Sequence, residues 1–278
     1  AGRTGLSLAL RLHRAHAVAS MTVTGRRPEA PRHPMFDGDP PAAVYRSAIT
    51  RPDATVDAVV IAVPDAAIAE VAERLASIHL APSIPVLHTS GSRSGDELRA
   101  LAARGHPVGS AHPLAALADP VSGADRLAGA TWGVEGEGAA RALAERIVHA
   151  CGGHALPIAP GGKAAYHAAA VLASNYAVAL LGMAERLMEE AGVHAEDARP
   201  ALAALAAGAV ENVAARGPAA ALTGPVMRGD AETVALHLAR LSADERALYC
   251  LEALRLARSA GLDAAAADRI GILLGEGS

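Results

Sequence analysis

The chain has 278 residues, of which 51% are hydrophobic and only 2% aromatic, and its formal net charge is −4. This length suits one large domain or two small ones, and the composition predicts a core of closely packed aliphatic side chains. No basic run or basic–aromatic patch is visible, which argues against a nucleic-acid partner. The two cysteines, Cys151 and Cys250, lack metal-ligand spacing. We therefore expect reduced thiols, a cytoplasmic location and no metal site.

Two features bear on membranes and targeting. His167, Ser174 and Asn175 interrupt the longest apolar stretch before it reaches the roughly 18 residues of a membrane span, so no membrane partner is expected. The chain starts at Ala1 rather than at a methionine, and no secretion signal is visible.

The first part of the chain, up to about residue 160, alternates short β-rich runs with runs of helical spacing. The predicted elements, in chain order, are a helix at 6–16, strands at 18–24 and 58–63, a helix at 66–77, a strand at 84–88, a helix at 96–104, strands at 107–110 and 130–134, a helix at 139–150 and a strand at 154–158. Strands joined by helical crossovers predict a mostly parallel, doubly wound sheet.

The second part carries helical patterns only. Helices are predicted at 163–191, 196–216, 231–241, 244–260 and 264–274, with glycines between them as C-caps or turns. Asp230 is expected to cap the third of these helices, and Pro200 to lie near the first turn of the second. The sequence therefore predicts two domains, a sheet-bearing one at residues 1–160 and an all-helical one at 161–278.

The first residues have the pattern that ends a dinucleotide-binding turn. Gly2 and Gly5, with Arg3 and Thr4 between them, match the second and third glycines of a G-x-G-x-x-G sequence, and an amphipathic helix follows. Gly2 would let the backbone approach a pyrophosphate, and Gly5 would let the helix pack on the sheet. The first glycine and the strand before it are missing from this sequence. The predicted fold class is α/β, with a doubly wound, Rossmann-type parallel sheet that lacks its first strand, followed by an all-α domain.

An arginine pair follows the next predicted strand. An NAD site usually carries an acid about 20 residues after the glycines, but here Gly25 is followed by Arg26 and Arg27. Guanidinium groups suit a 2′-phosphate, which predicts NADP(H) as the cofactor. The alternative is a solvated arginine pair in a loop.

Three loops follow predicted strands at the edge where ligands bind in such sheets. Val63 and Pro64 follow one strand and Ser90 follows the next, and both loops are candidates to border the cofactor. The alternative is ordinary turn chemistry, with Asp65 as an N-cap. His112 follows a third strand and is a candidate substrate-binding residue, or equally a structural hydrogen-bond donor.

The chain has a single lysine. Lysine and arginine together number 25, and only Lys163 is a lysine. An ammonium, unlike a guanidinium, changes its pKa readily on burial and can deliver a proton. Lys163 opens a predicted helix, where the helix dipole disfavours a cation by about 0.3–1 kcal/mol. We therefore expect a catalytic lysine; the alternative is a residue left by chance on a solvated helix end.

Five segments together resemble a known family. They are the turn Gly2–Gly5, HTSGS at 88–92, SAHPL at 110–114, GGKAAYHAAAVLASNY at 161–176 and ALTGPVMRGDAETV at 221–234. Over nearly its whole length the chain resembles the Rossmann-like predicted NADP oxidoreductases that carry a C-terminal domain of unknown function. More distantly it is similar to ketopantoate reductases and to β-hydroxyacid dehydrogenases, including 6-phosphogluconate dehydrogenase. That similarity implies a dinucleotide domain followed by a helical domain that often mediates dimerisation.

The same similarity bears on the lysine. In the ketopantoate and β-hydroxyacid enzymes a lysine opens the first helix after the sheet, with an asparagine four residues later. Lys163 matches the lysine, whereas His167 stands in place of the asparagine. On an ideal helix Asn175 lies about 80° round from His167, and Ser174 stays nearer the Lys163 face. Glu232 loosely matches a substrate-binding glutamate.

The predicted function is NADP-dependent reduction of a small oxo acid, with ketopantoate as a first guess from resemblance. Lys163 is the predicted proton donor, and His167 and Asn175 complete the catalytic set. For His167 the alternative is an interhelical hydrogen bond, and for Arg228 an ion pair beside a helix. The candidate substrate-binding residues are His112, Ser174, Thr223, Arg228 and Glu232.

Two other functions stay open. One is a non-catalytic NADP(H)-binding sensor or interaction protein, and the other is an imine or prephenate-type dehydrogenase, for which the His112–Pro113 loop is the argument. The alanine-rich helical stretches 164–181 and 201–213 predict burial against a twin subunit, and hence a homodimer through the helical half.

Overall fold

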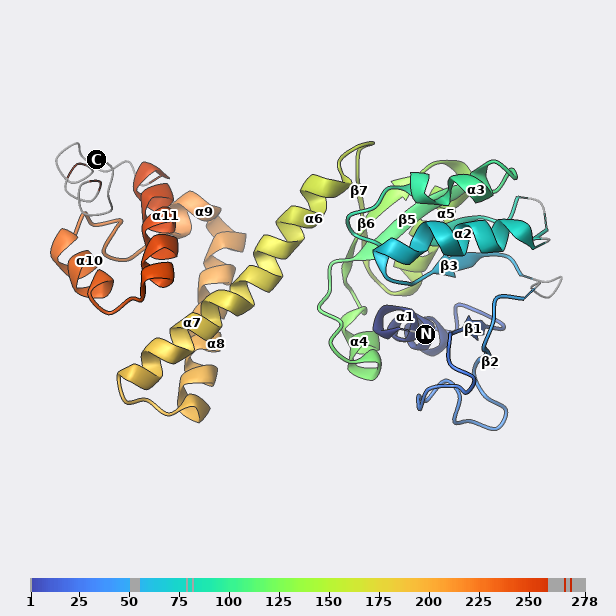
Figure 1. Ribbon diagram of the computed structural model, residues 1–278, viewed down its shortest axis with the longest axis horizontal. Helices are drawn as coiled ribbons and strands as arrows, with labels where there is room; N and C mark the ends of the chain where they lie inside the picture. The colour runs from blue at the N-terminus through green and yellow to red at the C-terminus, as the bar shows by residue number, and fades with distance from the viewer. Residues whose placement is uncertain are drawn as a thin grey trace. The chain divides into compact units, whose positions relative to one another are not determined.

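The computed structural model describes residues 2–50, 56–78, 80–81 and 83–259, together with Asp268 and Gly271 (Figure 1). Contacts within the chain divide it into two compact units, residues 1–175 and 176–278. The division falls inside the helical segment that begins at Lys163. The first turns of that segment therefore belong to the unit that contains the sheets.

A five-stranded sheet forms the centre of the first unit. Its strands lie in chain order: β3 (Val59–Ile61), β4 (Val86–His88), β5 (Val108–Pro113), β6 (Thr131–Gly136) and β7 (His154–Pro157). All neighbours are parallel except β5 and β6, which are antiparallel. The sheet is therefore mostly parallel, as predicted, with one antiparallel pair. The chain turns back beside the end of β5, where Leu114 N donates to Thr131 O, instead of crossing over the sheet.

A second, two-stranded sheet pairs β1 (Thr22–Thr24) with β2 (Val44–Arg46) in parallel. The short strand β2 was not predicted, because its three residues are too few to show an alternating pattern. β1 and β3 belong to different sheets, and no strand within the described residues joins them.

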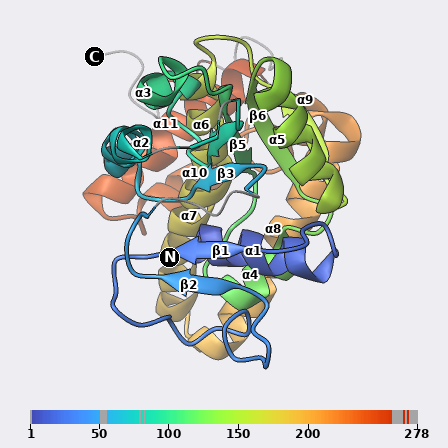
Figure 2. The same cartoon turned by 90° about the vertical axis from the view of Figure 1, so that its right-hand side faces the viewer.

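Helices cover both faces of the larger sheet. Figure 2 shows α2 (Ile68–Ser77) and α3 (Arg99–Ala102) on one side and α5 (Gly138–Ala150) on the other. Successive residues of β4 belong to different cores, one on each face of the sheet. Val86 packs in the core with Ile68 and Leu101, and Leu87 packs in the core with Leu143 and Trp132. The remaining helical segments of this unit are α1 (Arg3–Arg14), α4 (Pro120–Arg126) and the short 3₁₀ turns Asp65–Ala67 and Gly95–Leu98.

Helix α1 packs by its leucine face, with Leu6, Leu8 and Leu10 buried. A Cβ on Gly5 would lie 3.1 Å from the Cβ of Ala62, which directly follows β3. A side chain at this position would be crowded against Ala62, as expected for the third glycine of a dinucleotide turn.

The predicted long helix at 163–191 contains an irregular turn. It consists of α6 (Lys163–Val171), a π-helical turn (Leu172–Tyr176) and α7 (Ala177–Glu190). By length and composition alone, this segment is apolar enough to cross a membrane, so the expectation that polar residues interrupt it was wrong. This is a weak indication, because helices of soluble proteins pass the same test.

The second unit is helical throughout its described residues. Its helices are α7, α8 (Ala195–Arg216), α9 (Pro218–Ala221), α10 (Ala231–Leu238) and α11 (Ala243–Ser259). Asp230 caps α10 as predicted, accepting from Thr233 N at 3.1 Å. Pro200 lies inside α8, beyond the predicted first turn. Apart from Asp268 and Gly271, the helix predicted at 264–274 lies outside the described residues.

Candidate functional site

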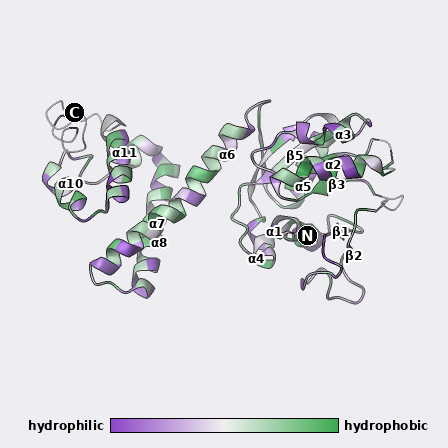
Figure 3. Ribbon diagram, viewed as in Figure 1, coloured by the Kyte–Doolittle hydropathy of each residue, from purple (hydrophilic) through white to green (hydrophobic). Residues whose placement is uncertain are grey.

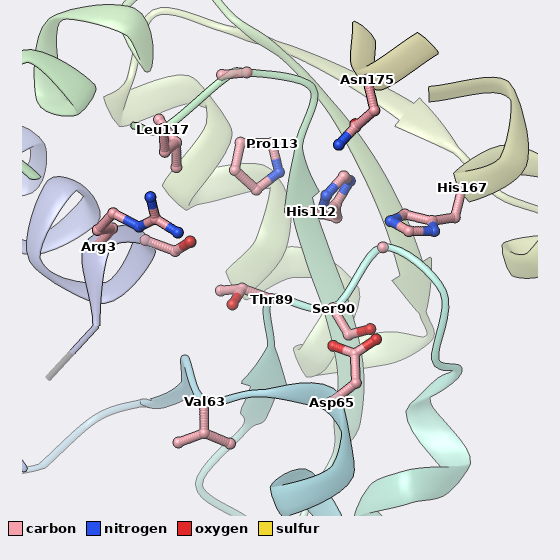
Figure 4. Close-up of a pocket in the computed structure, with 13 residues that line it drawn as sticks. Arg3, Val63, Asp65, Thr89, Ser90, His112, Pro113, Leu117, His167 and Asn175 are labelled. Atoms are coloured by element: carbon pink, nitrogen blue, oxygen red, sulfur yellow. The ribbon is translucent and has the colours of Figure 1, made fainter. Parts of the chain in front are cut away.

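A cavity of about 490 Å³ opens at the carboxyl ends of β3, β4 and β5, within the first unit (Figure 4). Ligands bind at this edge in doubly wound sheets. The predicted loops after the three strands meet here, together with the start of α1 and two residues of the α6 segment. The lining residues are Arg3, Thr4, Val63, Asp65, Thr89, Ser90, Gly91, His112, Pro113, Ala115, Leu117, His167 and Asn175.

The amino end of α1 forms one side of the cavity. Gly2 is the N-cap residue, no side chain caps the helix, and a Cβ on Gly2 would meet no described atom within 4 Å. Arg3 and Thr4 line the cavity, and Arg3 Nη1 donates to Ala118 O at 3.4 Å. A helix start with open N–H groups beside a cationic side chain favours an anionic group.

The loop after β4 is held in shape by its own polar groups. Ser90 N donates to His88 Nδ1 at 3.1 Å, and Ser92 N donates to Ser90 Oγ at 3.2 Å. Ser92 Oγ donates to Asp65 Oδ2 at 2.7 Å, so Asp65 ties this loop to the one after β3 instead of capping a helix. Burial raises the pKa of Asp65, but hydrogen bonds from Ser92 and Ser90 outweigh it and hold that pKa below its usual value.

His112 lies within β5, one residue before the strand ends, and not after a strand as predicted. Its Nδ1 lies 2.9 Å from the Tyr166 hydroxyl, which accepts from Gly133 N at 3.2 Å and lies 3.3 Å from His112 O. The hydroxyl has one proton, and we assign it to the shorter contact with Nδ1, which leaves the His112 proton on Nε2. Burial, followed by the positive charges of Lys163 and His167, lowers the pKa of His112 to about 4. His112 is therefore neutral near pH 7.

Gly91 leaves the space in which two imidazoles face each other. A Cβ on Gly91 would lie 2.4 Å from His167 Cδ2 and 2.9 Å from His112 Nε2. The two rings are 5.9 Å apart between centroids and nearly perpendicular. A residue with a side chain at this position would displace one or both rings.

Lys163 lies beside the cavity but does not line it. Its side chain is 2% exposed, and it is absent from the described residues that line the pocket. Nζ donates to Ser90 O at 2.7 Å and to Ser110 Oγ at 3.1 Å. Ser110 Oγ in turn donates to Glu135 Oε2 at 3.4 Å. Burial lowers the pKa of Lys163 to about 8, while Glu135 and Asp65 favour the charged form.

The π-helical turn carries the last site residues of this unit. Asn175 lines the cavity, whereas Ser174 is not among the described lining residues. Ser174 Oγ lies 2.9 Å from Ala170 O and 3.0 Å from Asn175 Oδ1. Figure 4 shows the amide nitrogen of Asn175 pointing toward His112.

The other predicted residues lie elsewhere. Arg26 and Arg27 are exposed in the loop after β1 and are not among the residues that line the cavity. Pro64 does not line the cavity either, although its neighbours Val63 and Asp65 do. Thr223, Arg228 and Glu232 belong to the second unit, so their substrate-binding role stays a prediction.

Sequence reasoning missed several residues of the site. Gly91, Tyr166 and Glu135 were not singled out, and Asp65 was considered only as a cap. Tyr166 could have been found, because it lies three residues after Lys163 and therefore shares its helix face. Glu135 gave no such signal, since only the sheet register brings it to Ser110.

The family Domain of unknown function (DUF2520) matches residues 130–256. The match over these residues confirms the C-terminal domain of unknown function that the resemblance named. A search of curated proteins gives no match.

Solved structures share the fold over nearly the whole chain. TM1727 from Thermotoga maritima has a TM-score of 0.69 and 22% identity, covering 92% of this chain and 96% of that one. A candidate NADP oxidoreductase from Bacteroides fragilis has a TM-score of 0.70 and 19% identity, with 93% and 95% covered. A pyrroline carboxylate reductase from Plasmodium falciparum, solved with NADP bound, has a TM-score of 0.60 and 12% identity, with 99% and 95% covered. These likenesses confirm the Rossmann-type fold with its helical C-terminal part.

Proposed function

We propose that this protein is an NADP(H)-dependent oxidoreductase that acts on a small polar substrate carrying a carbonyl group. The observation that carries the proposal is the cavity, where the amino end of α1 and the loops after β3 and β4 meet two imidazoles and an amide. Its volume of about 490 Å³ falls within the usual range for small-molecule sites. The solved structures of the same fold that are named for NADP support the choice of cofactor.

The residues at the start of α1 fit a dinucleotide. Gly2 leaves the helix end open, Gly5 allows close packing on the sheet, and Arg3 adds a positive charge. These residues would hold the diphosphate, and the exposed Arg26 and Arg27 after β1 would hold the 2′-phosphate. When bound, NADPH would supply the hydride.

Two histidines would serve the substrate oxygen in different ways. His112 is neutral and fixed by Tyr166, so its Nε2–H would donate a hydrogen bond without giving up the proton. His167 reaches the same cavity, and we assign it the exchange of the proton with that oxygen.

Lys163 would act through the wall of the cavity. Its ammonium holds Ser90 O and Ser110 Oγ together and lowers the pKa of His112. We therefore propose Lys163 as a positioning residue. The proton-donor role predicted from the sequence requires the amine to reach past Ser90.

NADPH oxidation by the purified full chain tests the proposal. The panel contains 2-oxo acids, including ketopantoate, together with 3-oxo acids and cyclic imines. We expect turnover with at least one carbonyl compound, and a loss of about 100-fold or more in His167→Ala. Tight NADPH binding without turnover of any compound would contradict catalysis and favour the cofactor-binding sensor.

Reduction of a C=N bond is the second candidate. The likeness to pyrroline carboxylate reductases over nearly the whole chain favours it, with TM-scores of 0.57, 0.60 and 0.58. Turnover of cyclic imines alone would select this candidate over carbonyl reduction.

We also propose that the helical unit forms a homodimer. No residue of α7 is buried within the chain, and α8 buries only Ala198. Figure 3 shows apolar residues along both helices. Val178 of α7 is 71% exposed, and Leu205 of α8 is 73% exposed. Apolar helix faces of this extent are normally covered, and a second copy of the chain would cover them.

A further inference from the structure

The π-helical turn Leu172–Tyr176 changes which residues of the α6 segment face the cavity. In an unbroken α-helix Asn175, eight residues after His167, would lie about 80° round the axis from it, and Ser174 would lie within about 20°. An i→i+5 turn takes up one extra residue. Asn175 then occupies the place of the seventh residue after His167, about 20° from it, and Ser174 moves off that face.

The observed lining agrees with this shifted register. His167 and Asn175 both line the cavity, and Ser174 is not among its described lining residues. Ser174 instead turns back on the helix, where its Oγ lies 2.9 Å from Ala170 O.

Ser174 also orients the Asn175 amide. The Ser174 hydroxyl has one proton, and we assign it to Asn175 Oδ1, which lies 3.0 Å away, so that the amide oxygen faces the serine. The amide nitrogen then points into the cavity toward His112, as Figure 4 shows. Two N–H donors, from Asn175 Nδ2 and His112 Nε2, are thereby directed at one space.

We propose that the π-helical turn places Asn175 in the cavity as a substrate-contacting residue that donates to an oxygen of a carbonyl or carboxylate, with Ser174 as the positioning residue. The identity of the ligand oxygen rests on the proposed function. The register of the turn does not, and it is tested without cofactor or substrate.

The register test places a carboxylate at each of two exposed, adjacent positions. Asn175→Asp and Ser174→Asp are compared in the full chain, with the His167 ring followed by ¹⁵N NMR through a pH titration. His112, Asp65 and Lys163 surround the site and are the same in both variants. We expect Asn175→Asp to raise the pKa of His167 by roughly half a pH unit or more, and Ser174→Asp to leave it nearly unchanged. A larger effect from position 174 would overturn the inference.

A deletion provides a second variant. Removing Ala173 makes Asn175 the seventh residue after His167 in a regular α-helix, so the residue stays on the cavity face without the π turn. Combined with Asn175→Asp, the deletion is expected to preserve the rise in the pKa of His167. Loss of that rise in a folded variant would contradict the register.

The contact with substrate has its own test. With any substrate found in the panel, Asn175→Ala is expected to raise KM about tenfold or more and to leave the NADPH Kd within about twofold. Ser174→Ala is expected to raise KM in the same direction by a smaller factor. An unchanged KM in Asn175→Ala would overturn the substrate contact while leaving the register result intact, whereas failure of the proposed function would show as no turnover at all.

Discussion

Lys163 is a buried ammonium that donates to two oxygens beside the cavity, Ser90 O and Ser110 Oγ. Burial makes the charged form costly: the unfolded chain holds this proton up to about pH 10.5, and the folded protein releases it near pH 8. The free energy of unfolding therefore rises with pH between these values. A lysine kept at such a cost contributes to function more than to stability.

Replacing Lys163 by Met tests this trade-off. At pH 7 the variant removes an ammonium whose burial costs about 3 kcal/mol and loses two hydrogen bonds, so we expect unchanged or higher stability. Urea unfolding at pH 7 and pH 9.5 measures it, and the advantage of the variant should shrink at the higher pH. Turnover should fall about tenfold or more. A strongly destabilised variant at pH 7 would show that the hydrogen bonds outweigh the burial of charge.

Gly91→Ala tests the space between the imidazoles. The added Cβ meets His167 and His112 at 2.4 and 2.9 Å, so at least one ring must move. We expect a loss of about tenfold or more in kcat, because catalysis is sensitive to such displacement. Gly182→Ala is the matched control, since its Cβ meets no described atom within 4 Å. Equal activity in the two variants would argue against a role for this histidine pair.

At the scale of elements, the sequence located the helices and strands of the first unit well where apolar runs were long. It did not predict that β6 runs antiparallel to β5, because runs of buried residues do not reveal strand direction. It also missed the π-helical turn, since the pattern through Ala168–Ser174 continues a helix without interruption. The predicted angle between His167 and Asn175 was therefore too large.

The end of β1 positions the arginine pair Arg26 and Arg27. Double replacement of Arg26 and Arg27 by alanine should weaken NADPH binding about tenfold or more and leave NADH binding nearly unchanged, since only NADPH carries the 2′-phosphate. Calorimetric titration of both cofactors measures the difference. Equal weakening for both would assign the arginines to another role.

At the scale of the whole molecule, the order of a sheet-bearing part followed by a helical part was predictable from the change in periodicity. The cavity was predictable in its loops, because strands of one sheet end at a common edge. The residues that support the cavity from outside were not predictable, because Tyr166 and Glu135 reach the site only through tertiary packing.

The exposed apolar faces of α7 and α8 predict a dimer in solution. Analytical ultracentrifugation of the full chain should give twice the monomer mass, and Leu205→Glu should shift the species toward monomer, with helical content unchanged by circular dichroism. An all-monomer wild type would leave these faces without the proposed partner.

The central claim is that cofactor and substrate meet in the cavity between α1, the Ser90 loop and the two histidines. A crystal structure of the full chain with NADP⁺ tests it most directly. We predict the diphosphate at the amino end of α1 and the nicotinamide in the cavity lined by Thr89, Ser90 and His112. A nicotinamide bound outside that cavity, or no density for the cofactor at saturating concentration, would contradict the account.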